Sequence, residues 1–281
     1  MSDLHSINEA INKKAGRKLL PSMAVGLSLI SLVWLALSYE RVIFAIVVAV
    51  AVVLGVRELV RAFSARGIVI SFNGLTIATV GLSYAAWVGG VAGLAIATAI
   101  AFPLLLIRAL LQGPEGFVAK ATATTFGLLY LPFLAGFLIL LARPSTGFQR
   151  VMTFVVLVGC NDTFGYIVGV LLGRHPLVPK ISPKKTWEGL AGSLVFTMAG
   201  GALAFQYIMD MHWWIGIIVG LMIVFTATCG DLIESAMKRD LSLKDMGTLL
   251  PGHGGMLDRL DSVVLSAPAM WLALELVKRF L

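Results

Sequence analysis

Residues 235–261 read SAMKRDLSLKDMGTLLPGHGGMLDRLD, and apolar runs long enough to cross a membrane flank them on both sides. A stretch this polar cannot belong to the apolar mass of the protein, because charged groups buried without partners are costly. It must therefore contact water, a charged ligand, or both. We take residues 235–261 as the centre of the candidate active site, and we predict the fold from the apolar runs around them.

The composition indicates an integral membrane protein. Hydrophobic residues make up 58% of the 281 residues and charged residues only 13%, whereas roughly a quarter of the residues in soluble domains are charged. The mean hydropathy is +0.92. A chain of this length holds about eight to ten spans of ~20 residues and leaves no room for a soluble domain of ordinary size. We expect residues 1–281 to form a single integral membrane domain.

The apolar runs predict an all-α, polytopic fold with about nine transmembrane helices. Gly89 and Gly90 interrupt an apolar run that is too long for one crossing, and we expect a turn there. The predicted spans cover residues 19–38, 42–56, two helices within 74–111, 121–142, 151–173, 189–208, 213–230 and 262–280. Residues 1–18 are then a cytoplasmic leader, residues 19–150 hold the first five spans, and residues 151–281 form the candidate catalytic half.

The basic residues predict how the protein is oriented. With nine spans, 17 of the 22 lysines and arginines fall on the side of the N-terminus and 5 on the other. Since lysine and arginine accumulate in cytoplasmic loops, we expect the N-terminus and both polar segments, 174–188 and 235–261, to face the cytoplasm from the cell membrane. The net charge of +7 is explained by this bias and by anionic lipid headgroups of the bilayer. We therefore expect no nucleic-acid partner.

Charged residues recur at helical spacing beside the last two spans. Asp231, Glu234 or Ser235, and Lys238 share one face of a helix that continues the span 213–230 beyond the membrane. Asp258 and Asp261 lie three apart at the start of the last span. Each group also has a simpler interpretation. The first could be a helix face in contact with headgroups, and the second could complement a helix dipole, which is worth ~0.3–1 kcal/mol.

A third acidic position lies inside a span. Asp162 is near the middle of residues 151–173. A carboxylate at that depth costs at least ~2.5–3 kcal/mol on insertion scales, and such residues usually mark a polar cavity or a functional site. This position favours a site shared between helices, although it also agrees with a transport pathway.

Two loops are suited to phosphate. Residues 251–255, PGHGG, place glycine amides and His253 directly before the helix that bears Asp258, where backbone donors and the helix dipole favour an anion. Residues 181–189, ISPKKTWEG, hold Lys184 and Lys185 near the membrane surface. An ordinary re-entry turn and a positive-inside loop are the simpler interpretations. Together with the carboxylates, the loops predict a polyphosphate bound with Mg²⁺.

These residues resemble the phosphatidate cytidylyltransferases, also called CDP-diacylglycerol synthases. The resemblance covers residues 161–262 and includes the loop SPKKTWEG at 182–189. It also rests on the following residues: Asp162, Tyr166, Gly169, Gly173, Arg174, Ser235, Lys238, Arg239, Lys244, Asp245, Pro251, His253, Gly254, Gly255, Asp258, Arg259 and Asp261.

The resemblance implies transfer of CMP from CTP to phosphatidic acid, with Mg²⁺ required, K⁺ as a second cation, and a homodimer. It implies that Asp231 and Asp258 bind metal, with Asp162, Asp245 and Asp261 as further ligands. Lys238, Arg239 and Lys244 are expected to neutralise charge during catalysis. The residues expected to bind substrate are Ser182, Lys184, Lys185, Ser235, His253, Gly254, Gly255 and Arg259.

Three alternatives to this function are considered. A CDP-alcohol phosphotransferase is disfavoured, because its acidic pattern is absent and Asp258 and Asp261 are three apart rather than four. A cytidylyltransferase acting on another lipid phosphate agrees with the same residues. A membrane transporter would use Asp162 along its pathway and would show solute flux without CTP turnover.

Overall fold

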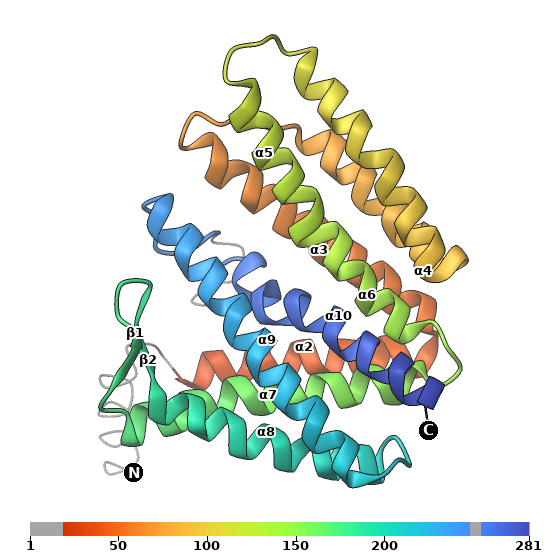
Figure 1. Ribbon diagram of the computed structural model, residues 1–281, viewed down its shortest axis with the longest axis vertical. Helices are drawn as coiled ribbons and strands as arrows, with labels where there is room; N and C mark the ends of the chain where they lie inside the picture. Colours follow the sequence, from red (N-terminus) through yellow and green to blue (C-terminus); the bar gives the residue numbers. More distant parts are fainter. Residues whose placement is uncertain (1–18, 248–253, 281) are drawn as a thin grey trace.

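The computed structural model describes residues 19–247 and 254–280 (Figure 1). The predicted leader, residues 1–18, lies outside the described residues. The helices are α2 (Leu19–Tyr39), α3 (Arg41–Ser64), α4 (Phe72–Leu110), α5 (Phe117–Leu128), the π-helix η1 (Leu129–Phe133), α6 (Leu134–Ala142), α7 (Gly147–Leu172), α8 (Trp187–Tyr207), α9 (Trp213–Asp240) and α10 (Leu257–Phe280).

The helices are apolar and of membrane length. Within the described residues, seven helical segments are long and apolar enough to cross a membrane, counting α5, η1 and α6 as one. Within α2, the segment Gly26–Tyr39 counts as a shorter apolar helix. Only helices and closed barrels satisfy every backbone donor and acceptor in lipid, so apolar sequence of this length folds as helices. The prediction of an all-α, polytopic membrane protein is confirmed.

The turn predicted at Gly89-Gly90 lies inside α4. Gly90 has φ 63° and ψ −147°, so the 39-residue helix is broken there, in a backbone region that is open essentially only to glycine. Arg143 bonds the carbonyl groups next to the break, since its Nε donates to Trp87 O at 2.7 Å and its Nη2 to Val88 O at 3.1 Å. The two arms of α4 run alongside each other in Figure 1.

The polar segment 174–188 is partly extended, which the sequence did not predict. Strands β1 (Pro176–Val178) and β2 (Ser182–Thr186) pair antiparallel, with Pro176 opposite Thr186 and Val178 opposite Ser182. Glu188 closes the base of this hairpin, because it accepts the amides of Arg174 and His175 at 3.1 and 3.2 Å. The expected loop is therefore an ordered hairpin fixed to the start of α8.

Helix α9 continues well past the expected membrane boundary at residue 230 and ends at Asp240. The prediction that Asp231, Glu234 and Lys238 follow one another on a helix is therefore confirmed. Near its start, α9 approaches α8 closely, and a side chain on either Gly201 or Gly216 would overlap the backbone of the other helix. This contact fixes the position of α9 relative to α8.

Helix α10 joins the two halves of the protein. It packs against α9 and α7 on one side and against α3 and α6 on the other, and Figure 1 shows it between these groups. Leu257, Val264, Ala267 and Met270 along it are fully buried. The start of α10 is thereby held where residues from both halves can reach it.

Candidate active site

One cavity of about 700 Å³ lies between α7, α8, α9, α10 and the β1–β2 hairpin. Its size is within the usual range for sites that bind small molecules. It is lined by Asn161, Asp162, Gly165, Tyr166, Gly169, Val170, Leu177, Lys184, Lys185, Thr186, Gly189, Leu190, Ser193, Thr228, Asp231, Asp258, Arg259, Asp261 and Ser262. Residues from both polar segments and from the middle of α7 therefore share one space.

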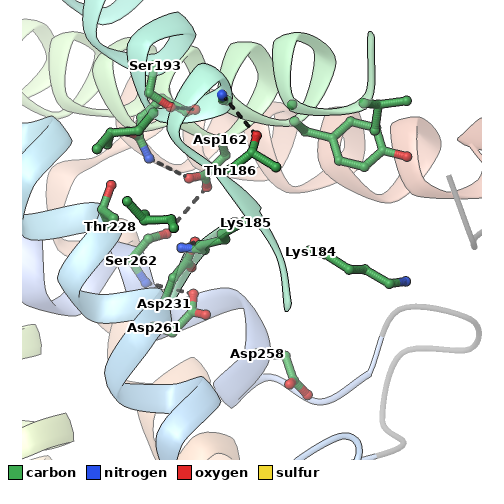
Figure 2. Close-up of a pocket in the computed structure, with 18 of the residues that line it drawn as sticks. Asp162, Lys184, Lys185, Thr186, Ser193, Thr228, Asp231, Asp258, Asp261 and Ser262 are labelled. Atoms are coloured by element: carbon green, nitrogen blue, oxygen red, sulfur yellow. Dashed lines mark hydrogen bonds and ion pairs between the residues drawn. The ribbon is translucent and has the colours of Figure 1, made fainter. Parts of the chain in front are cut away.

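Three carboxyl groups from three helices, those of Asp162, Asp231 and Asp261, line this cavity and are here called the acidic group (Figure 2). The carboxyl groups of Asp231 of α9 and Asp261 of α10 lie close enough to interact directly. Asp162 of α7 accepts a bond from Asn161 Nδ2 at 2.9 Å and a longer one from Ser262 Oγ at 3.4 Å. Two charged carboxylates this close repel each other, so the pair favours a cation beside it.

Lys185 supplies positive charge to this group. Its Nζ lies 2.6 Å from Asp231 Oδ2, and both side chains are roughly one-third exposed. Lys184 also lines the cavity, but Figure 2 shows its side chain directed away from the acidic group. Consecutive residues of a strand point to opposite faces, so β2 can direct only one of the two lysines at Asp231.

Asp258 has a different set of partners. Lys238 Nζ donates to Asp258 Oδ1 at 2.9 Å and contacts Glu234 Oε2 at 2.6 Å. Asp258 Oδ2 accepts the amides of Met246 at 3.2 Å and Gly255 at 2.6 Å. Asp258 therefore organises the start of α10 as well as lining the cavity, and Lys238 is already neutralised by two carboxylates.

Comparison with known proteins identifies the family. A model of the cytidylyltransferase family matches residues 22–277. The chain belongs to the cytidylyltransferase family. A relative named phosphatidate cytidylyltransferase in Mycobacterium leprae is 38% identical over 280 residues, which cover 94% of this chain and 90% of the relative.

Other relatives carry the same name. One in Mycobacterium bovis is 36% identical over 277 residues, covering 94% of this chain and 90% of its own. One in Staphylococcus haemolyticus is 36% identical over 136 residues, covering 48% of this chain and 52% of its own. The resemblance drawn from the sequence motifs is thereby confirmed, and the match extends through the N-terminal half, where no motif had been recognised.

Several residues that the family resemblance implied lie elsewhere. Within the described residues, Ser182, Ser235, Lys238, Arg239, Lys244, Asp245, Gly254 and Gly255 do not line the cavity. Lys244 and Asp245 are exposed, and Arg239 Nε donates to Ile181 O at 3.2 Å, which ties α9 to the hairpin. His253 lies outside the described residues. The roles assigned to these residues remain predictions.

The cavity also contains polar residues that were not among the predicted site residues. Thr186, Thr228 and Ser262 line it, as does Ser193, whose Oγ donates to Asn161 O at 2.7 Å. A signal for three of them was present, because Thr228 lies one helical turn before Asp231, Ser262 follows Asp261, and Thr186 follows Lys185. Ser193 had no such signal within its apolar helix.

The oxygen ligands of the acidic group are of the kind that bind Mg²⁺, the metal that the family resemblance implied. No set of three His, Cys, Asp or Glu side chains in the described ranges is arranged to hold a metal ion. Mg²⁺ is usually bound, however, by one or two carboxylates together with substrate phosphates and water. The contact between Asp231 and Asp261, with Asp162 beside them, provides such a pair of oxygen ligands.

Proposed function

We propose that the protein is a phosphatidate cytidylyltransferase, which transfers CMP from CTP to phosphatidic acid and releases pyrophosphate. The observation that supports this most is one cavity, at the membrane helices α7–α10, that is lined by the acidic group and also by Lys184, Lys185 and Arg259. The acidic group suits a hard cation, and the basic residues suit phosphate oxygens. The names of the relatives supply the identity of both substrates.

The two substrates would reach the cavity from different phases. The hairpin side of the cavity is polar, whereas the outer faces of α7, α8 and α9 expose large apolar side chains such as Leu171, Val195 and Phe225. Phosphatidic acid can therefore approach through the lipid while CTP arrives from water. Binding both in one cavity places the reacting phosphates next to each other, which is a large part of what an enzyme contributes to such a reaction.

The reaction needs no covalent intermediate on the protein. An oxygen of the phosphatidate phosphate attacks the α-phosphorus of CTP, and the bond from that phosphorus to the pyrophosphate oxygen breaks. Lys185 lies at the acidic group and is placed to contact the phosphates, and Lys184 and Arg259 flank the same space. These cations lower the barrier by neutralising the charge that develops on the departing pyrophosphate.

Magnesium is part of this proposal. Asp231 and Asp261 would hold it, with Asp162 beside them, and Asp258 would join if Lys238 moved from its Oδ1. The metal would supply charge neutralisation for the phosphate oxygens when bound. A K⁺ ion as second cation, with Asp245 as a further ligand, remains part of the proposal on family resemblance alone.

The proposal also covers the topology of the protein. We propose nine passes, with the two arms of α4 counted separately and α2 included. The bias of lysine and arginine supports an orientation with the N-terminus and the cavity on the cytoplasmic side of the cell membrane. A homodimer is proposed from the family resemblance.

The proposed activity can be tested with CTP labelled at one phosphate. Purified protein, phosphatidate vesicles and Mg²⁺ should give a labelled lipid from α-labelled CTP and none from γ-labelled CTP. Chelation of the metal should reduce product formation to background, because the acidic group would lose its cation, and added Mg²⁺ should restore it.

Three results would argue against this function. Lipid labelling that persists without Mg²⁺ would contradict the metal assignment. If labelling occurs only with another lipid phosphate, that lipid and not phosphatidic acid is the acceptor. Solute flux in proteoliposomes without CTP turnover would favour a transporter.

A further inference from the structure

A buried carboxylate from the N-terminal half holds the start of α10. Glu58 of α3 is only 6% exposed. It accepts the amide of Met256 at its Oε1, at 3.0 Å, and the amide of Leu257 at its Oε2, at 2.8 Å. These partners lie 198 and 199 residues further along the chain. Glu58 does not line the cavity, so any effect on the site must pass through the backbone that it holds.

The surroundings of Glu58 are shaped to its carboxylate. The first amides of a helix have no partners within the helix, and they carry its positive dipole end, so a carboxylate there is doubly favourable. A side chain on either Gly247 or Gly255 would overlap the carboxylate of Glu58. The sequence had suggested that Gly255 lets a substrate phosphate approach, but in the structure its missing side chain makes room for Glu58.

A second residue of the N-terminal half holds the end of α9. Arg66, two residues after α3, donates from Nε to Leu241 O at 3.1 Å and from Nη2 to Asp240 O at 2.8 Å, and it also bonds Ser242 Oγ. Ser242 has φ 56°, a left-handed conformation that is unfavourable for a residue other than glycine. The guanidinium group therefore occupies the carbonyl end of α9 and holds a strained helix terminus in place.

We propose that Glu58 and Arg66, here called the Glu58/Arg66 pair, are positioning residues for the active site. The acid holds the amino end of α10 and the base holds the carboxyl end of α9, so the charges of both match the helix dipoles they contact. The pair fixes both ends of the connection between the two helices that bear Asp231 and Asp258. This gives the N-terminal half a role in catalysis, and it rests on the proposed cytidylyl transfer.

The route from Glu58 to the cavity is short. Asp258 Oδ2 accepts the amide of Gly255 at 2.6 Å, and Gly255 directly precedes Met256, which Glu58 binds. Asp258 Oδ1 in turn holds Lys238 at 2.9 Å. Release of Met256 and Leu257 would let the first turn of α10 shift, and with it Asp258 and Arg259 at the cavity wall.

The test compares Glu58→Ala and Glu58→Gln with Arg57→Gln, a change at the neighbouring exposed residue of α3. In Glu58→Ala, kcat should fall about 10–100-fold, as is typical when an outer-shell contact is lost. The KM for CTP should change by less than about threefold, because no substrate contact is removed. Glu58→Gln keeps one acceptor oxygen and should retain part of the rate, whereas Arg57→Gln should match the unmodified protein.

Hydrogen exchange of the same proteins supplies a readout that does not depend on the reaction. Exchange at residues 254–260 should quicken in both Glu58 variants while α7 and α8 keep their rates. The inference is overturned by an unchanged kcat in Glu58→Ala, or by exchange that rises equally in all helices. If the unmodified protein forms no CDP-lipid, the proposed function fails, and local exchange at 254–260 still decides the role of Glu58. If Glu58→Ala does not fold, the isosteric Glu58→Gln decides it.

Discussion

Replacing Asp231 with asparagine should reduce the formation of CDP-lipid by about 10²–10³-fold in kcat, the range seen when one electrostatic contact to a transition state is removed. Asp231 is the member of the acidic group that forms an ion pair with Lys185, at 2.6 Å, and it lies close to Asp261. Asparagine keeps the shape and removes the charge, so neither the metal nor Lys185 is held. Initial rates with α-labelled CTP measure the effect.

Asp240→Asn provides the matched control for this change. Asp240 lies on the same helix, is exposed, and ends α9 rather than facing the cavity. Its variant should keep the rate of the unmodified protein. If Asp231→Asn retains full activity at ordinary Mg²⁺ concentration, Asp231 has no part in metal binding and the site must be assigned again.

Replacing Lys185 with alanine should lower kcat by about 10²-fold, because it removes the only cation in contact with Asp231 among the described residues. Without it the carboxyl groups of Asp231 and Asp261 lose their neutralising partner, and the substrate phosphates lose a donor. Lys180→Ala tests whether loss of any lysine of the hairpin lowers kcat equally, since Lys180 is exposed at the turn of the hairpin. Equal losses in the two variants would show a general charge effect and contradict the specific role of Lys185.

Much of the fold follows from local sequence. Gly89 and Gly90 predict the break in α4, because glycine readily adopts the positive φ of 63° that Gly90 has there. The hairpin at 174–188 was not predicted, because its local sequence does not favour strands. Its strands contain proline and adjacent lysines, which are poor strand formers, and its closure depends on Glu188 binding amides 13 and 14 residues earlier. Such a contact has no signal in the strand pattern itself.

The sequence predicted those residues of the candidate site that belong to recognisable motifs. Asp162, Asp231, Asp258 and Asp261 were all expected in one site, and all line one cavity. Glu58 could not be found in the same way, because near the end of an apolar span it resembles an ordinary charged residue at the membrane surface. Its partners are distant in sequence. They are also backbone amides, which every residue except proline has, so no motif indicates them.

Direct transfer of CMP from CTP to a lipid phosphate in this cavity has a stereochemical consequence at the α-phosphorus. The most direct test uses CTP made chiral by a sulfur atom at the α-phosphorus, with phosphatidic acid as acceptor. Direct in-line attack by the lipid phosphate predicts a CDP-lipid with inverted configuration at that phosphorus. Retention of configuration would require a covalent intermediate on the protein and would contradict direct transfer, as would the absence of any lipid product.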